Sequence, residues 1–135
     1  MSDDRFIIGR TGTTPLVFRG NKIAGAGGPM ANKSKRWHEV DLYRTSGGRY
    51  VLEIRYVTVR PNEPSHSWAD VVEGRDGVLT RLAQHDPLSC FIGWPNLDRY
   101  AHQQSIARAE VEAQWAHTVS ALTTELPDLF GEEVE

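Results

Sequence analysis

The sequence predicts one α+β domain in which a small antiparallel sheet of three to four strands precedes helices that pack on one of its faces. Two observations indicate this fold class. Residues 37–60 alternate apolar and polar side chains with a period of two on both sides of a glycine-containing turn, which is typical of a half-buried β-hairpin. Residues 97–126 contain no Gly or Pro and are rich in Ala, Gln and Glu, which favours a long helix. The chain of 135 residues has the size of a single domain.

Residues 1–36 are predicted to form a glycine-rich basic arm that supplies only short edge strands. Apolar side chains occur there in two short runs, 6–8 and 16–18, each bounded by Gly, Pro or Thr. The segment 20–35 contains several glycines and a proline, which disfavours a regular element. The compact domain is therefore expected to span residues 37–126.

The register of the hairpin at 37–60 follows from parity. The apolar residues of both predicted strands occupy even positions, namely Val40, Leu42, Tyr50, Leu52, Ile54 and Tyr56. Because opposed residues share a face, the numbers of paired residues must add to an even total. Pairing Val40 with Leu52 and Leu42 with Tyr50 meets this condition. It leaves a three-residue loop, 45–47, in which Gly47 supplies a left-handed conformation.

Two acidic residues, Asp41 and Glu53, lie on these strands opposite the apolar set. They either form a carboxylate pair in a cleft or belong to a solvated sheet face, where Arg49 and Arg55 pair with them. The second interpretation is the more common one for charged residues at alternating positions of a strand.

The second half of the sequence predicts one more strand and two helices. Residues 65–73 form the third strand, and Asp76 is a suitable N-cap for the helix that follows. Asn96 caps a second helix of roughly 30 residues, which would be about 45 Å long. That length exceeds a compact domain with a radius of gyration of about 14 Å. We therefore expect a bend near residues 102–105 or packing against another chain, and then a frayed acidic tail, 127–135.

Basic and acidic side chains are divided unevenly along the chain. Residues 1–60 carry a net charge of +6 and residues 61–135 carry −9, within a total of −3. Such a separation steers an acidic partner to one end of the molecule, or draws the two halves together. No apolar run approaches the roughly 18 residues of a membrane span, and the acidic start lacks the pattern of a signal peptide. A cytoplasmic protein without membrane contact is expected.

Residue spacing disfavours several kinds of chemical site. The stretch Gly27–Ser34 approaches a phosphate-binding loop, but a strand-like segment follows where that loop requires a helix. No two of the five His are two to five residues apart, and the single Cys90 rules out a cysteine-built zinc site. We expect no metal and no cofactor. A small hydrolase with an unrecognised site remains an alternative, which would gather His66, His85 or Glu53 in one pocket.

The favoured function is that of a small non-enzymatic binding or accessory protein, of the class found with mobile elements, whose basic region contacts an acidic partner. That partner is an acidic protein surface or a nucleic-acid backbone. The predicted contact residues are Arg19, Lys22, Lys33, Lys35, Arg36 and Trp37. Alternatively, the chain forms a homodimer or larger homo-oligomer through its long helix, where small residues permit close approach. The predicted residues of that interface are Ala109, Ala113, Trp115 and Ala116.

Overall fold

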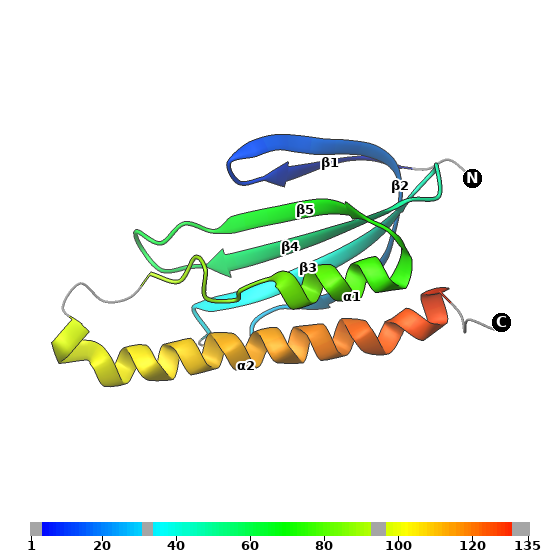
Figure 1. Ribbon diagram of the computed structural model, residues 1–135. Helices are drawn as coiled ribbons and strands as arrows, with labels where there is room; N and C mark the ends of the chain where they lie inside the picture. The colour runs from blue at the N-terminus through cyan, green and yellow to red at the C-terminus, as the bar shows by residue number, and fades with distance from the viewer. Residues whose placement is uncertain (1–3, 31–33, 93–96, 131–135) are drawn as a thin grey trace.

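The computed structural model describes residues 4–30, 34–92 and 97–130, with the backbone alone at 97 and 98. Five antiparallel strands follow one another in a meander, and two helices cover one face of the sheet (Figure 1). The elements are β1 (Asp4–Arg10), β2 (Thr13–Gly27), β3 (Arg36–Thr45), β4 (Tyr50–Thr58), β5 (His66–Val72), α1 (Gly74–Gln84) and α2 (Leu97–Phe130). The α+β class is confirmed, whereas the expected number of three to four strands is wrong.

The additional strands come from the predicted arm. β2 runs for 15 residues and pairs with β1 on one side and β3 on the other. A Cβ atom at Gly20 or at Gly27 would collide with a carbonyl oxygen of β3, so glycine is needed there for close approach of the two strands. The prediction that 20–35 is irregular is therefore wrong for residues 20–27, because glycines at 20 and 27 serve strand packing.

The sheet curls until its first and last strands lie close together (Figure 1). The Thr11 amide donates to the carbonyl oxygen of Ser67 at 2.9 Å, and the Ser67 hydroxyl donates to that of Gly9 at 2.8 Å. The β1–β2 hairpin thus folds over the sheet face that the helices leave open. As a consequence, both faces of the central strands are buried.

The β3–β4 hairpin and the third predicted strand, observed as β5, are both present. The parity of the hairpin is confirmed, but its register is displaced by two residues, since Val40 pairs with Ile54 and Leu42 with Leu52. The three-residue loop is 46–48, and Gly48 rather than Gly47 adopts the left-handed conformation, with φ of 82°. Parity determines which face a side chain occupies, and it does not select one partner among several on that face.

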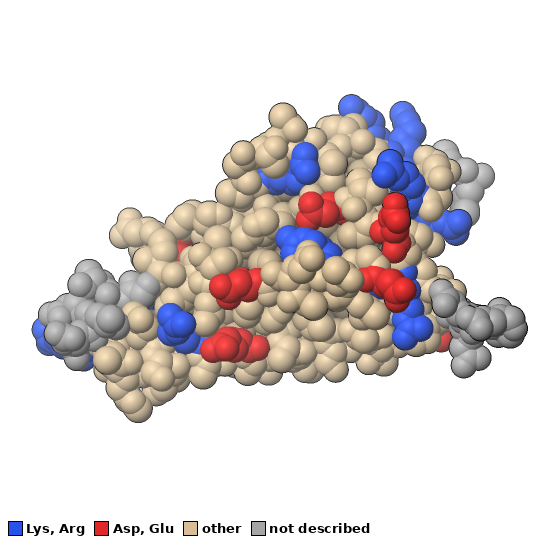
Figure 2. Space-filling view, in the orientation of Figure 1, with Lys and Arg blue, Asp and Glu red and all other residues tan. Residues whose placement is uncertain are grey.

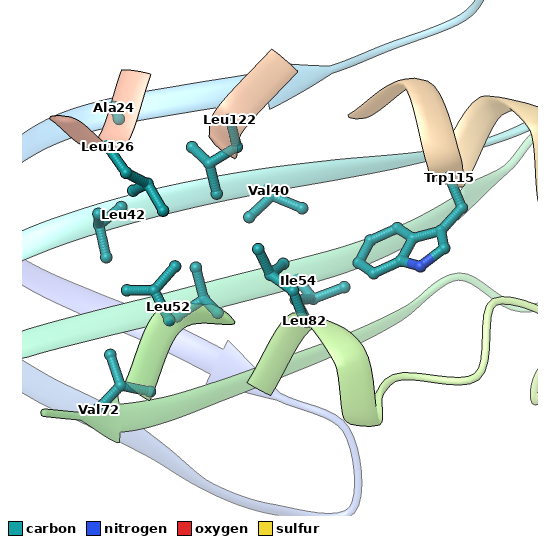
Figure 3. Packing of buried hydrophobic residues seen from close by; sticks show 11 residues of the cluster. Ala24, Val40, Leu42, Leu52, Ile54, Val72, Leu82, Trp115, Leu122 and Leu126 are labelled. Atoms are coloured by element: carbon teal, nitrogen blue, oxygen red, sulfur yellow. The ribbon is translucent and has the colours of Figure 1, made fainter. Parts of the chain in front are cut away.

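The main core lies between the sheet and the helices (Figure 3). Leu42 and Ile54 from the sheet and Leu122 and Leu126 from α2 are at most 1% exposed. Burial of each such aliphatic side chain stabilises the fold by about 1.5–3 kcal/mol. Leu82 of α1 completes this core, so both helices are anchored to one sheet face.

α2 is longer than the sheet that it covers. Its backbone leaves helical geometry at Tyr100, shortly before the expected bend at 102–105. Buried positions begin at Val111, whereas most side chains between 99 and 110 are exposed, so the first part of α2 extends beyond the sheet (Figure 1). Residues 127–130, expected in the tail, are helical, and the Phe130 ring packs on a tyrosine of β4. Residues 131–135 lie outside the described part of the chain.

Candidate functional site

The structure distributes the predicted contact residues over two ends of the sheet. Arg19 lies beside the β3–β4 turn, where its carbonyl oxygen accepts a hydrogen bond from the Ser46 amide. Lys35 and Arg36 lie at the start of β3, about 30 Å away along that strand. Lys33 lies outside the described residues. The basic region is therefore not one surface, because β2 and β3 carry its two ends in opposite directions.

Three of these residues are engaged within the chain. The Lys22 ammonium lies 2.8 Å from Asp41, and the Trp37 indole donates to Glu39 at 2.7 Å. Arg36 is bound to Glu63 at 2.8 Å, and the side chains of that pair are only 7% and 3% exposed. Lys35 is exposed.

The α2 residues predicted for a homo-oligomer also divide. Ala109, Ala113 and Ala116 are exposed, and Ala113 lines the groove described below, whereas Trp115 is 8% exposed and belongs to the main core. The buried stripe of α2 runs through Val111, Gln114, Trp115, Thr118, Leu122 and Leu126. Gln114 and Thr118 in this stripe are polar, so the spacing of apolar residues along the sequence does not identify the whole stripe.

Lys35 and Arg36 border a groove that also lies against Met30, Ser34 and the overhanging part of α2. The groove has a volume of about 580 Å³. Its apolar lining comes from Met30, Ile106, Ala107 and Val111, and its basic lining from Lys35, Arg36 and Arg60. Glu110 is the one carboxylate among the described residues that line it. A concave surface with an apolar base and a few polar groups at its rim is the usual form of a binding site.

Gln114 holds the helix at the position that creates this groove. Its Oε1 atom accepts a hydrogen bond from the His38 amide at 2.7 Å, and its Nε2 atom donates to the carbonyl oxygens of His38 and Gly28 at 2.9 and 3.1 Å. The His38 amide and carbonyl lie on the edge of β3 beyond Glu39, the last residue of β3 that pairs with β2, and the Gly28 amide also donates to that carbonyl oxygen at 3.1 Å. Gln114 therefore completes the pairing of this strand edge and attaches α2 to it.

Arg36 forms a rigid wall of the groove. Its partner Glu63 also accepts hydrogen bonds from the Thr58 hydroxyl and the Ile92 amide, at 2.5 and 2.9 Å. Burial acts to raise the pKa of Glu63, but these hydrogen bonds and the Arg36 charge outweigh it and lower the pKa. The guanidinium also lies over the Phe91 ring, 4.4 Å from its centroid. The loop before α2 is thereby attached to the strands.

Exposed apolar side chains gather around the same end of the sheet. Met30 is 58% exposed, and Ile106 is 48% exposed. Val59 and Ile92, at 56% and 49%, both belong to segments that hydrogen-bond to residues 35 and 36. These four are a majority of the seven large apolar side chains that are exposed within the described residues. Exposed apolar side chains that gather in one region are typical of interaction surfaces.

His38 and His85 form a second polar feature, inside the helix-covered face. Their Nε2 atoms lie 3.2 Å apart, and both rings pack against Trp115. Burial lowers the pKa of His38 to about 3 and that of His85 to about 4, so both imidazoles are neutral at pH 7. No carboxylate or nucleophile among the described residues hydrogen-bonds to either ring. A cavity of about 550 Å³ between α1 and α2 borders His85, with mainly apolar walls.

The three residues considered for a hydrolase do not meet. His66 stacks with Trp68 at the β5 end, and His85 lies beneath the helices. Glu53 is on the opposite face of the sheet, where it binds Arg55 at 2.8 Å. Across the described ranges, no three His, Cys, Asp or Glu side chains are arranged to hold a metal ion.

Comparison with known proteins adds no further information on this site. No protein family, curated protein or solved structure gives a significant match to the chain. Within the described residues, no helix combines the length and the apolar character that crossing a membrane requires. The functional argument therefore depends on the geometry of the groove and its surroundings.

Proposed function

We propose that the protein is a non-enzymatic binding protein whose groove receives an acidic, partly apolar segment of a partner protein. The observation that supports this function is the groove itself, which combines exposed Met30 and Ile106 with the basic side chains of Lys35, Arg36 and Arg60. Apolar side chains of the segment fill the groove, and its carboxylates approach the basic rim.

The charges around the groove indicate that the partner segment is acidic. Three basic side chains and one carboxylate line the groove, and the Arg36 charge is largely balanced by Glu63. The exposed Lys35 suits a carboxylate of the segment, which matches a short acidic segment better than a long polyanion. The whole chain has a net charge of −3 and a pI of about 5.9, which opposes general attraction to nucleic acid.

Binding of a designed peptide tests the proposal directly. A fluorescently labelled amphipathic peptide of Glu and Leu is titrated with the protein, beside a peptide in which Lys replaces every Glu. The acidic peptide is expected to raise the fluorescence polarisation and the basic peptide is not. Ile106→Glu should weaken binding at least tenfold, because it places a charge at the centre of the apolar surface.

The matched control is Ala121→Glu, which adds the same charge to an exposed position of α2 that does not line the groove. This variant should bind the peptide like the unmodified protein. Equal losses in the two variants would contradict the proposal. Tighter binding of a DNA or RNA oligonucleotide would favour the nucleic-acid alternative, and a mass that rises with concentration in light scattering would favour the homo-oligomer.

A further inference from the structure

A second basic surface lies on the outer side of the β1–β2 hairpin. Arg5 pairs with Arg19 across the two strands, and Ile7 pairs with Val17. Since alternate residues of a strand share a face, these four side chains point the same way. Their neighbours Phe6 and Phe18 point inward, together with Ile8 and Leu16. Ile7 and Val17 are 60% and 53% exposed, so the outer face is both basic and apolar.

Two further arginines extend this surface onto the next strands. Arg44 of β3 pairs with Asn21 of β2, two residues beyond Arg19, and Arg49 closes the β3–β4 turn by accepting a hydrogen bond from the Thr45 amide. Arg5, Arg19 and Arg44 thus lie on three adjacent strands, and Arg49 lies in the turn that leads to the fourth, a width of about 15 Å. Figure 2 shows blue side chains gathered over this end of the sheet.

The charges of these four arginines are not balanced by ion pairs. All four are exposed, and no carboxylate of the described residues forms an ion pair with any of them. Lys22 and Arg81, by contrast, form ion pairs with Asp41 and Asp70. An unpaired group of one sign in a protein of opposite net charge is a surface for a complementary partner.

We propose that the outer hairpin face, defined as Arg5, Ile7, Val17, Arg19, Arg44 and Arg49, binds an acidic protein surface that carries aliphatic side chains between its carboxylates. Guanidinium groups bind carboxylates through two parallel hydrogen bonds. The exposed Ile7 and Val17 require an apolar partner, which a nucleic-acid backbone does not offer. A second copy of the chain placed symmetrically on the same face would set arginines against arginines.

This face and the groove lie at opposite ends of the sheet, so one molecule has room for two acidic partners, or for two distant parts of one partner. The hairpin face is formed by side chains of adjacent strands, whereas the groove lies between a helix and other segments of the chain. The hairpin face therefore suits a flat folded surface, whereas the groove suits a narrow segment.

Chemical-shift mapping tests the hairpin face separately from the groove. The ¹⁵N-labelled protein carrying Ile106→Glu, which disables the groove, is titrated with the Glu/Leu peptide, a Glu-only peptide, single-stranded DNA and vesicles containing phosphatidylserine. The Glu/Leu peptide should shift the amide signals of residues 5–7, 17–19 and 44–49. The Glu-only peptide should bind at least threefold more weakly, because it leaves Ile7 and Val17 in water.

The double variant Arg5→Glu/Arg19→Glu should lose at least tenfold in affinity for the Glu/Leu peptide. Arg75→Glu/Arg108→Glu changes the net charge equally at exposed positions outside this face and should leave the affinity unchanged. Equal losses in both double variants would overturn the proposal, as would tighter binding of DNA or vesicles. The absence of shifts at the three segments would also overturn it.

Discussion

On β3 and β4, even-numbered side chains meet the helices and odd-numbered side chains meet the β1–β2 hairpin. The helix-covered face is aliphatic, with Val40, Leu42, Leu52 and Ile54 all at most 1% exposed. The hairpin-covered face begins with an aromatic cluster in which Phe6, Phe18 and Tyr43 stack within 5.5 Å of one another. It then becomes ionic, although Asp41 and Glu53 are only 7% and 6% exposed.

Arg55 makes the ionic part of this face possible. Its guanidinium contacts Glu39, Asp41 and Glu53 at 2.8 to 2.9 Å. Burial raises the pKa of Glu53, although Arg55 and the Tyr43 hydroxyl partly offset the shift. The comparison shows that strict alternation does not imply a solvated face. Charged residues at alternate positions also occur on a buried face, provided that they neutralise one another.

Truncating a fully buried aliphatic side chain on the helix-covered face should cause the largest loss in the free energy of unfolding. Leu122→Ala is expected to lower the free energy of unfolding by about 2–5 kcal/mol, because Leu122 is fully buried and its removal leaves a cavity. Urea denaturation followed by circular dichroism measures this loss. Ser120→Ala, at an exposed position of the same helix, should change stability by less than about 0.5 kcal/mol.

Removing the central cation of the ionic face should cost somewhat less. Arg55→Ala leaves three carboxylates without their shared partner, and we expect a loss of about 2–4 kcal/mol at pH 7. The difference from the unmodified protein should narrow as the pH falls towards 4, since protonation removes the repulsion. A difference that stays constant with pH would show that Arg55 contributes mainly through packing.

Acid should weaken the helix-covered face through its histidine pair. The pKa of His38 and that of His85 are lowered in the folded state, so below about pH 6.5 the unfolded chain binds more protons than the folded one. Stability should therefore fall on acidification from pH 6.5, by on the order of 2 kcal/mol at pH 5. His85→Phe should flatten this dependence, whereas His102→Phe, at an exposed position, should retain it.

Lys22, which is more exposed than Arg55, should contribute least of these groups to the free energy of unfolding. The Lys22 side chain is 52% exposed, and its partner Asp41 keeps its contact with Arg55 when Lys22 is removed. Lys22→Met is therefore expected to change the free energy of unfolding by less than about 1 kcal/mol. A loss as large as that of Arg55→Ala would mean that the network needs two cations. Raising the salt concentration should reduce the small difference further.

Features that depend on nearest neighbours could be predicted from the sequence. The hairpin, the third strand and the helices express local periodicities of two and of 3.6 residues. The charge division is also a sequence property, and the arginines at the outer hairpin face belong to the basic half. Arg19 is exposed, and its contact with a partner stays a prediction.

Only the tertiary structure decided the long-range contacts. β2 is a strand because β3 lies beside it, and glycine at positions 20 and 27 then permits close approach. Gln114 hydrogen-bonds to groups 76 and 86 residues away in the sequence, and no local pattern identifies those partners. The partners of Arg55 are nearer, because the hairpin places Asp41 and Glu53 beside it, and the sequence already indicated these ion pairs. The groove forms where α2 extends past the sheet, next to the point at which Gln114 binds α2 to the backbone of β3. Periodicity shows which side of an element is buried, whereas the identity of what covers it depends on chain segments that meet only after folding.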